Sequence, residues 1–142
     1  MVRFAAMAVM LSAAAAWPAG FAWRTYVAHE QVQFGRAESD ERAFWIACDD
    51  GKTLSAGGPS AAGQSEGPGA AAKIGGRSYA GHYIERGDSI NFEVRIGPDE
   101  PFIRSLLRNR GFRLEEGGRA VSIPGKGAAK VVAPLLKACG SA

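Results

Sequence analysis

Trp45-Ile46-Ala47-Cys48 is one of two short segments that carry a cysteine in this 142-residue chain, and Lys137-Ala138-Cys139 near the C-terminus is the other. In an oxidising compartment, an even pair of cysteines with none left over is most simply a disulfide. A Cys48–Cys139 bridge would join an early strand to the last helix. Because it closes a loop of about 90 residues, the chain-entropy model gives about 4.5 kcal/mol of stabilisation. The alternative, a redox-active pair, lacks the Cys-x-x-Cys spacing that tunes thiol acidity.

The amino-terminal residues have the pattern of a secretory signal. Arg3 supplies a positive charge, an apolar run extends from Phe4 to Ala16, and Gly20-Phe21-Ala22 is a small-x-small cleavage pattern. We therefore expect residues 1–22 to be a signal peptide and residues 23–142 to form a single periplasmic domain.

Two alternatives remain open at this end of the chain. The first is an earlier cut after Ala14-Ala15-Ala16. The second is a retained inner-membrane anchor, since Phe4 to Trp23 is about as long as the roughly 20 apolar residues that a membrane helix needs.

Composition indicates one folded domain without a nucleic-acid partner. The chain is 46% hydrophobic and 22% charged, as globular proteins are. The formal net charge of +3 falls to +2 without Arg3. This balance lacks the strong basic excess that nucleic acid requires.

Local patterns predict a β-dominated α+β fold, an antiparallel sheet or small sandwich with a mid-chain helix and a C-terminal helix. The clearest strand is residues 89–96, where Ile90, Phe92 and Val94 alternate with polar residues. The other strands that we expect are 31–34, 43–47, 52–55, 77–84, 112–116 and 119–123.

Two hairpins carry their own turn signals. Asp50-Gly51 is typical of a type I′ turn, because Asp and Gly tolerate positive φ. Gly117-Gly118 sets a register that places Glu116 opposite Arg119, so we expect these two charges to pair at the hairpin tip.

The helices and one long loop complete the predicted fold. Asp99 is the expected N-cap of the mid-chain helix and Gly111 its left-handed C-terminal residue. The last helix, residues 128–139, contains Pro134, which predicts a kink, with two short helical pieces as the alternative. Residues 56–76 are rich in Gly, Ala, Ser and Pro, so we expect a flexible loop.

Motifs for cofactor chemistry are incomplete, so we expect neither a cofactor nor a metal. Gly51-Lys52-Thr53 resembles the end of a phosphate-binding loop, but Ile46 stands where the motif needs its first glycine. The chain has only two histidines, His29 and His82. A small periplasmic hydrolase or metal-dependent enzyme that uses His29 or His82 with nearby carboxylates is the alternative to a non-catalytic binding module.

Arginines gather around the mid-chain helix and the hairpin after it. The candidate patch consists of Arg104, Arg108, Arg110 and Arg113. Such a patch suits an envelope protein with an acidic surface, anionic lipid or lipopolysaccharide. The alternative interpretation is a solvated helix face with local charge pairs.

The order of these features resembles a known family. An aromatic strand residue shortly before a cysteine, a β-rich middle and a final apolar helix that ends in cysteine resemble small proteobacterial envelope proteins of the invasion-associated locus B type. The resemblance covers roughly Phe44 to Cys139. It implies a periplasmic, disulfide-stapled, β-sandwich-like module with envelope or host-interaction roles and no enzymatic activity, and it assigns no functional residue.

Overall fold

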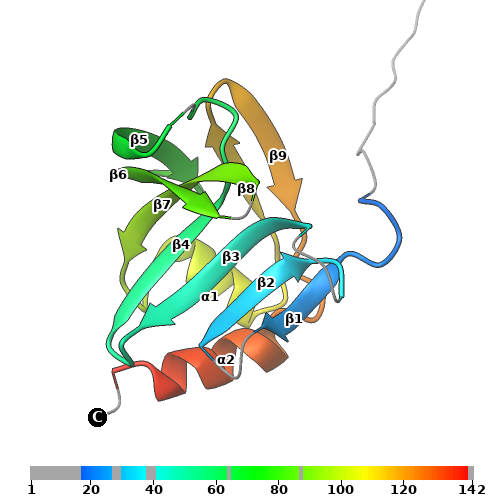
Figure 1. Cartoon of the computed structure of the whole chain (residues 1–142). Helices are drawn as coiled ribbons and strands as arrows, with labels where there is room; N and C mark the ends of the chain where they lie inside the picture. Colours follow the sequence, from blue (N-terminus) through cyan, green and yellow to red (C-terminus); the bar gives the residue numbers. More distant parts are fainter. Residues whose placement is uncertain (1–16, 27–29, 38–40, 64, 87, 141–142) are drawn as a thin grey trace, which may run out of the picture.

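A computed structural model describes residues 17–26, 30–37, 41–63, 65–86 and 88–140. Within these ranges the chain forms one antiparallel sheet of nine strands and two helices, with strand order β1-β2-β3-β4-β7-β6-β5-β8-β9 (Figure 1). The strands are β1 Ala22–Tyr26, β2 Gln31–Gly35, β3 Arg42–Asp49, β4 Thr53–Pro59, β5 Gly67–Ile74, β6 Arg77–Arg86, β7 Ser89–Ile96, β8 Phe112–Glu116 and β9 Arg119–Ile123; the helices are α1 Pro101–Leu107 and α2 Ala129–Ala138. The predicted fold class is confirmed.

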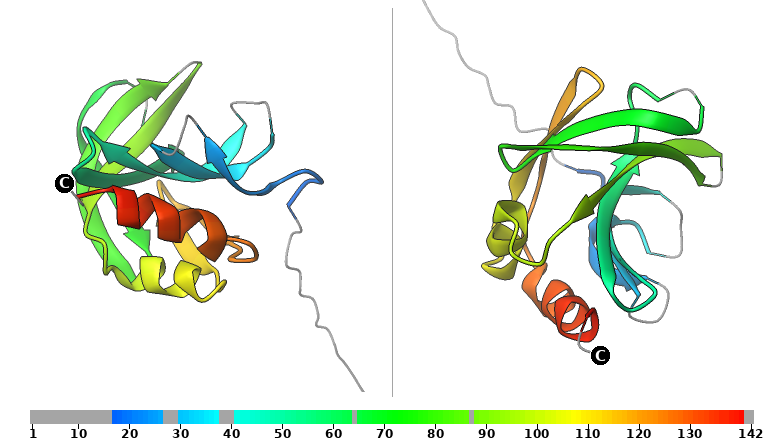
Figure 2. Two further views of the ribbon diagram at one scale, coloured as in Figure 1. Left: turned by 90° about the horizontal axis from the view of Figure 1, so that it is seen from below. Right: turned by 90° about the vertical axis from the view of Figure 1, so that its left-hand side faces the viewer.

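The sheet curls around the two helices, which lie against one of its faces (Figure 2). We call this helix-covered side the inner face and the opposite side the outer face. Strand twist accumulates across the sheet and brings its two ends toward each other. The indole Nε1 of Trp23 in β1 donates a hydrogen bond of 2.7 Å to the carbonyl oxygen of Pro124, just after β9.

The core fills the space between the inner face and the helices. Alternate residues of each strand point inward, as the period of two requires. Phe44, Phe102 and Phe112 form its aromatic centre, with ring centroids 5.0 to 5.8 Å apart. The inner members of β7 are Phe92, Val94 and Ile96, which confirms the predicted alternation.

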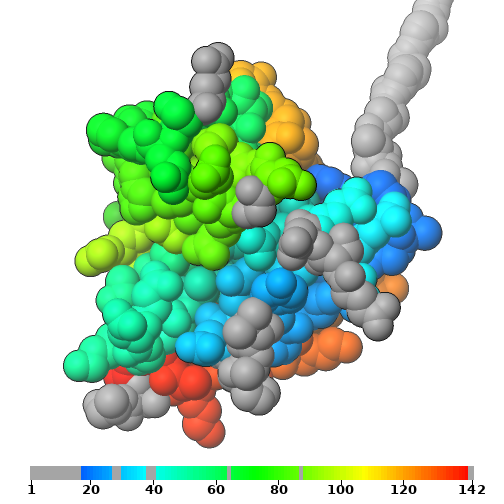
Figure 3. Space-filling view, in the orientation of Figure 1, coloured from blue at the N-terminus to red at the C-terminus, as the bar shows by residue number. Residues whose placement is uncertain are grey.

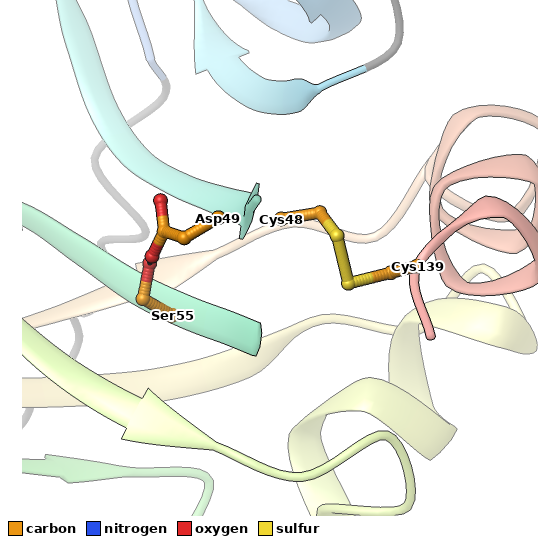
Figure 4. Close-up of a disulfide and its surroundings, with 4 residues drawn as sticks. All are labelled: Cys48, Asp49, Ser55 and Cys139. Atoms are coloured by element: carbon orange, nitrogen blue, oxygen red, sulfur yellow. Dashed lines mark hydrogen bonds between the residues drawn. A yellow bond between two sulfur atoms is a disulfide. The ribbon is translucent and has the colours of Figure 1, made fainter. Parts of the chain in front are cut away.

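The predicted disulfide is present. Cys48 at the end of β3 is bonded to Cys139 at the end of α2, with Cα atoms 5.7 Å apart (Figure 4). The bridge spans 91 residues and fixes the end of the C-terminal helix to a central strand. The amide of Gly140 also donates to the carbonyl oxygen of Gly51, which ties the chain after α2 to the β3–β4 turn.

Both predicted hairpins form with the expected backbone. Asp50 and Gly51 have φ of 55° and 70°, and Gly117 and Gly118 have φ of 60° and 80°. Glu116 is paired in register with Arg119, as predicted. The expected charge pair is wrong, however, because the buried Glu116 carboxylate accepts hydrogen bonds from the Ser60 hydroxyl and the Ala61 amide.

The flexible loop expected over residues 56–76 is wrong for most of its length. Strand β4 continues to Pro59, and β5 occupies Gly67–Ile74 with antiparallel pairing to β6. Small side chains do not prevent a strand here, because the backbone hydrogen bonds are satisfied along the ladder. At Gly57 and Gly63 the side chains of Trp45 and Tyr83 occupy the space where a Cβ would lie.

The helix ends also differ from the sequence pattern. Helix α1 has Glu100 rather than Asp99 at its N-cap position, and no side chain caps it. Asn109, with φ of 58°, takes the left-handed position that we expected for Gly111. Pro134 lies inside one continuous helix, so the two-piece alternative is wrong.

None of the helices within the described ranges combines the length and apolar character needed to cross a bilayer. The proposed signal or anchor lies mostly outside those ranges, whose first residue is Trp17.

Candidate functional site

A polar hollow of about 950 Å³ opens on the outer face of the sheet. Figures 1 and 3 present this face to the viewer, with β1 to β3 on one side and the β6–β7 hairpin on the other. The described residues that line it are Tyr26, Glu30, Gln31, Arg42, Ala47, Cys48, Asp49, Asp50, Pro59, Glu85, Arg86, Asp88, Ser89 and Asn91. Amides, guanidinium groups and carboxylates dominate the lining.

The indole of Trp45 is buried beneath the outer face between these two sides. Trp45 lies on the opposite face of β3 from the core residues Phe44 and Ile46, yet it has no exposed surface. Its Nε1 donates to the side-chain oxygen of Asn91 at 3.2 Å. The ring fits because Gly57 has no side chain, since a Cβ there would lie 2.6 Å from the indole Cζ2 atom.

Two guanidinium groups cover the indole. The Arg86 Cζ atom lies 4.9 Å from the Trp45 ring centroid, and the Arg42 Cζ atom lies 5.9 Å from it. Arg86 also approaches the Glu93 carboxylate at 3.5 Å, and Arg42 donates to the Gln33 side-chain oxygen at 3.5 Å. Cation–π attraction to the buried ring therefore holds two positive charges at the hollow.

Three buried nitrogen atoms near this hollow have no hydrogen-bond partner among the described residues. They are Nε2 of Gln31, Nε2 of Gln33 and Nε of Arg86. Gln31 is 8% exposed and lines the hollow directly. An unsatisfied buried donor costs about 1–3 kcal/mol, so such groups are rare in folded proteins unless something else uses them.

Carboxylates lie at two places around these donors. One group consists of Glu30, Asp49 and Asp50. The Cys48 amide donates to the carbonyl oxygen of Glu30, which places Glu30 beside the end of β3. The Asp49 side chain points away from the disulfide and accepts a hydrogen bond of 3.0 Å from Ser55 (Figure 4). Glu85 and Asp88 line the hollow at the β6–β7 hairpin.

A second polar cluster lies away from the hollow. Tyr79 donates to Glu100 at 2.7 Å, and Arg77 pairs with the same carboxylate oxygen at 3.0 Å. Burial, followed by the hydrogen bond to Glu100, raises the pKa of the Tyr79 hydroxyl well above its usual range. Because these groups satisfy one another and anchor the start of α1, we interpret the cluster as structural.

The histidines of the predicted enzyme alternative are not placed in the hollow by any described contact. His82 lies on β6 with its Nε2 atom 3.0 Å from Glu93, and its side chain is 53% exposed. His29 lies outside the described residues. The part of the chain that the structure describes contains no group of three or more His, Cys, Asp or Glu side chains suited to a metal ion.

The predicted arginine patch is exposed. All four of its residues, Arg104, Arg108, Arg110 and Arg113, present their side chains to solvent on α1, β8 and the turn between them. Arg104 donates to the Asp99 carbonyl oxygen at 2.8 Å, and Arg113 lies 3.5 Å from Glu115. None of the four lines the hollow.

Sequence reasoning missed the hollow. The one available signal was the alternation of Gln31 and Gln33 with Val32 and Phe34, which predicts a strand with a polar outer face. No local pattern brings Arg86 from the β6–β7 hairpin to Trp45 in β3.

No family model, curated protein or solved structure matches this chain. The function must therefore be inferred from the geometry of its own side chains.

Proposed function

We propose that this protein is a non-catalytic binding module of the cell envelope, exported to the periplasm, that holds a small polar ligand in the outer-face hollow. The Cys48–Cys139 disulfide supports an oxidising compartment. The signal-like pattern of residues 1–22 and the resemblance to invasion-associated locus B proteins agree with export.

The observation that carries the proposal is the set of unpartnered donors at the hollow. Gln31 Nε2 and Arg86 Nε are buried without acceptors, beside a space large enough for a ligand. Ligand sites in proteins are concave and use a few placed polar groups for orientation. A ligand that supplies acceptor oxygens would recover the free energy that these donors cost, after small side-chain movements.

Binding is favoured over hydrolysis by the chemistry of the lining. Its described polar side chains are amides, guanidinium groups, carboxylates and the hydroxyls of Tyr26 and Ser89. His82, the imidazole that has a carboxylate partner, does not line it. These groups are suited to hold and orient a polar molecule.

The test measures thermal unfolding of the oxidised protein with small carboxylates, phosphate esters, amino acids and neutral sugars. A bound ligand at 100 times its Kd stabilises by about 2.7 kcal/mol. We expect at least one class to raise the unfolding midpoint of the wild type and to have a smaller effect on Gln31→Met, which keeps the side-chain length and removes the amide. Arg95→Gln, on the same face but outside the lining, is the control. If no class stabilises the protein, the proposal is wrong.

The exposed arginine patch supports a second candidate function, attachment to an acidic surface. Four exposed guanidinium groups within ten residues would attract anionic lipid, and salt would screen that attraction. We expect the wild type to co-sediment with phosphatidylglycerol vesicles at low salt and the Arg104→Ala/Arg108→Ala variant to do so more weakly. Binding that persists unchanged at high salt would contradict this function.

A further inference from the structure

We propose that the hollow takes a small dipolar molecule, with a carboxylate at one end and an ammonium group at the other, as an amino acid has. This inference rests on the proposed binding function and specifies its ligand class. It follows from the different chemistry of the two parts of the lining.

The central part of the hollow favours an anionic group of a ligand. Arg42 and Arg86 bring two positive charges to it, with Glu93 near Arg86 and the carboxylates of Glu85 and Asp88 at the β6–β7 hairpin. The unpartnered nitrogen atoms of Gln31 and Arg86 still require acceptors. A carboxylate has two acceptor oxygens and carries the opposite charge, and hydrogen bonds to a charged group are roughly twice as strong as neutral ones.

The end of the hollow near the β3–β4 turn favours a cationic group of the ligand. Glu30, Asp49 and Asp50 gather there. A purely anionic ligand would meet their repulsion, and a purely cationic one would leave the donors of Gln31 and Arg86 without acceptors. A ligand with both charges satisfies both parts.

The register of β2 and β3 sets the distance between the two parts. Gln31 is paired with Ala47, and Asp49 is two residues farther along the same face of β3. Gln31 and Asp49 are therefore diagonal neighbours across the strand pair, roughly 7–8 Å apart. A ligand that contacts both positions therefore needs only a short carbon chain between its two charged groups.

The test uses calorimetric titration of the oxidised, full-length protein with 4-aminobutanoate, butanoate and butylamine. These probes share a four-carbon chain and differ in which charged ends they carry. We expect 4-aminobutanoate to bind at least about tenfold more tightly than either singly charged probe, which corresponds to about 1.4 kcal/mol.

Two variants separate the two ends of the site. Asp49→Asn/Asp50→Asn removes both charges, while asparagine can still accept the Ser55 hydrogen bond and tolerates the positive φ of residue 50. In this variant 4-aminobutanoate should bind about as weakly as butanoate. In Gln31→Met 4-aminobutanoate should bind more weakly than to the wild type, because its carboxylate loses one donor, while Arg42 and Arg86 still attract it. Asp99→Asn, an exposed aspartate outside the lining, should leave all three affinities unchanged.

The possible outcomes distinguish this inference from the proposed function. If butanoate or butylamine binds as tightly as 4-aminobutanoate, the dipolar ligand is wrong and the binding function stands. If none of the three binds while a sugar or phosphate ester stabilises the protein, the dipolar ligand is again wrong and the binding function stands. If no probe of either set binds, both proposals are wrong.

Discussion

Gly57 shows how one absent side chain permits both the sheet and the base of the hollow. A Cβ at this position would lie 2.1 Å from the carbonyl oxygen of Phe92 and 2.6 Å from the Trp45 ring. We predict that Gly57→Ala destabilises the protein by about 3 kcal/mol or more. The clashing Phe92 carbonyl oxygen belongs to the backbone of a central strand, which cannot move aside without a large cost in free energy. Urea unfolding measures this, with Gly97→Ala as the control, since its nearest contact is 3.3 Å to a side-chain oxygen. Equal stability of the two variants would contradict the prediction.

Glu100 predicts a pH dependence of stability. Burial acts to raise its pKa, but hydrogen bonds from Tyr79 and the Gly97 amide, with the charges of Arg77 and Arg104, outweigh burial and lower the pKa below the ordinary 4.5. The ionised carboxylate therefore stabilises the folded state above about pH 4.5, and this contribution is lost as the pH falls through the lowered pKa.

The Glu100→Gln variant checks this sign. We expect the wild type to be more stable than the variant at pH 7 and the difference to shrink as the pH falls below about 4.5. Urea unfolding of both proteins at several pH values measures the difference. A gap that does not change with pH would show that the charge of Glu100 does not contribute.

At the level of elements, the structure confirms the predictions that rested on two independent local signals. Strand β7 had strict alternation with clear ends, and the β8–β9 hairpin had Gly117-Gly118 with matching apolar pairs. Strand β5 had neither signal, because its alanines and glycines carry no alternation and its pairing with β6 fixes it. Composition alone therefore cannot separate a flexible loop from a strand whose partner supplies the order.

The proline inside helix α2 predicts an effect on stability. Pro134 lies inside the helix and is exposed, and it cannot donate a hydrogen bond to the carbonyl of residue 130. We predict that Pro134→Ala stabilises the protein by about 1–2 kcal/mol. Alanine restores the helix hydrogen bond, and this gain exceeds the cost of the greater conformational entropy of the unfolded chain without proline. Thermal unfolding checks this, and an unchanged or lower midpoint would show that the helix is adapted to the proline.

Across the whole molecule, the disulfide was predictable and the hollow was not. Two cysteines and a signal-like leader were enough to pair Cys48 with Cys139. The hollow depends on how the curled sheet brings the β6–β7 hairpin, with Arg86, to the same side as Gln31 and Trp45. That approach is set by the whole strand order, which no local pattern encodes.

The bridge should account for a large part of the total stability. We predict that Cys48→Ala/Cys139→Ala lowers the free energy of unfolding by about 4–5 kcal/mol, because a closed loop of 91 residues restricts the unfolded chain. Urea unfolding of the oxidised wild type and the variant measures the loss. Dithiothreitol should destabilise the wild type and leave the variant unchanged, and equal sensitivity would contradict the role of the bridge.

The folded body also predicts where an exported chain is cut. Trp17 donates its Nε1 hydrogen to the Ser122 carbonyl oxygen at 3.0 Å, and its ring lies 5.5 Å from Phe21 and 5.3 Å from Phe34. Cleavage after Ala22 would remove Trp17 and Phe21 from this aromatic cluster. We therefore predict the earlier cut, after Ala16, and a mature chain that begins at Trp17. Amino-terminal sequencing and intact mass of periplasmic material test this.

The aromatic cluster also predicts a difference in stability. We expect a protein that begins at Trp23 to be less stable than one that begins at Trp17 by about 3 kcal/mol. Equal stability of the two proteins would show that the cluster contributes nothing.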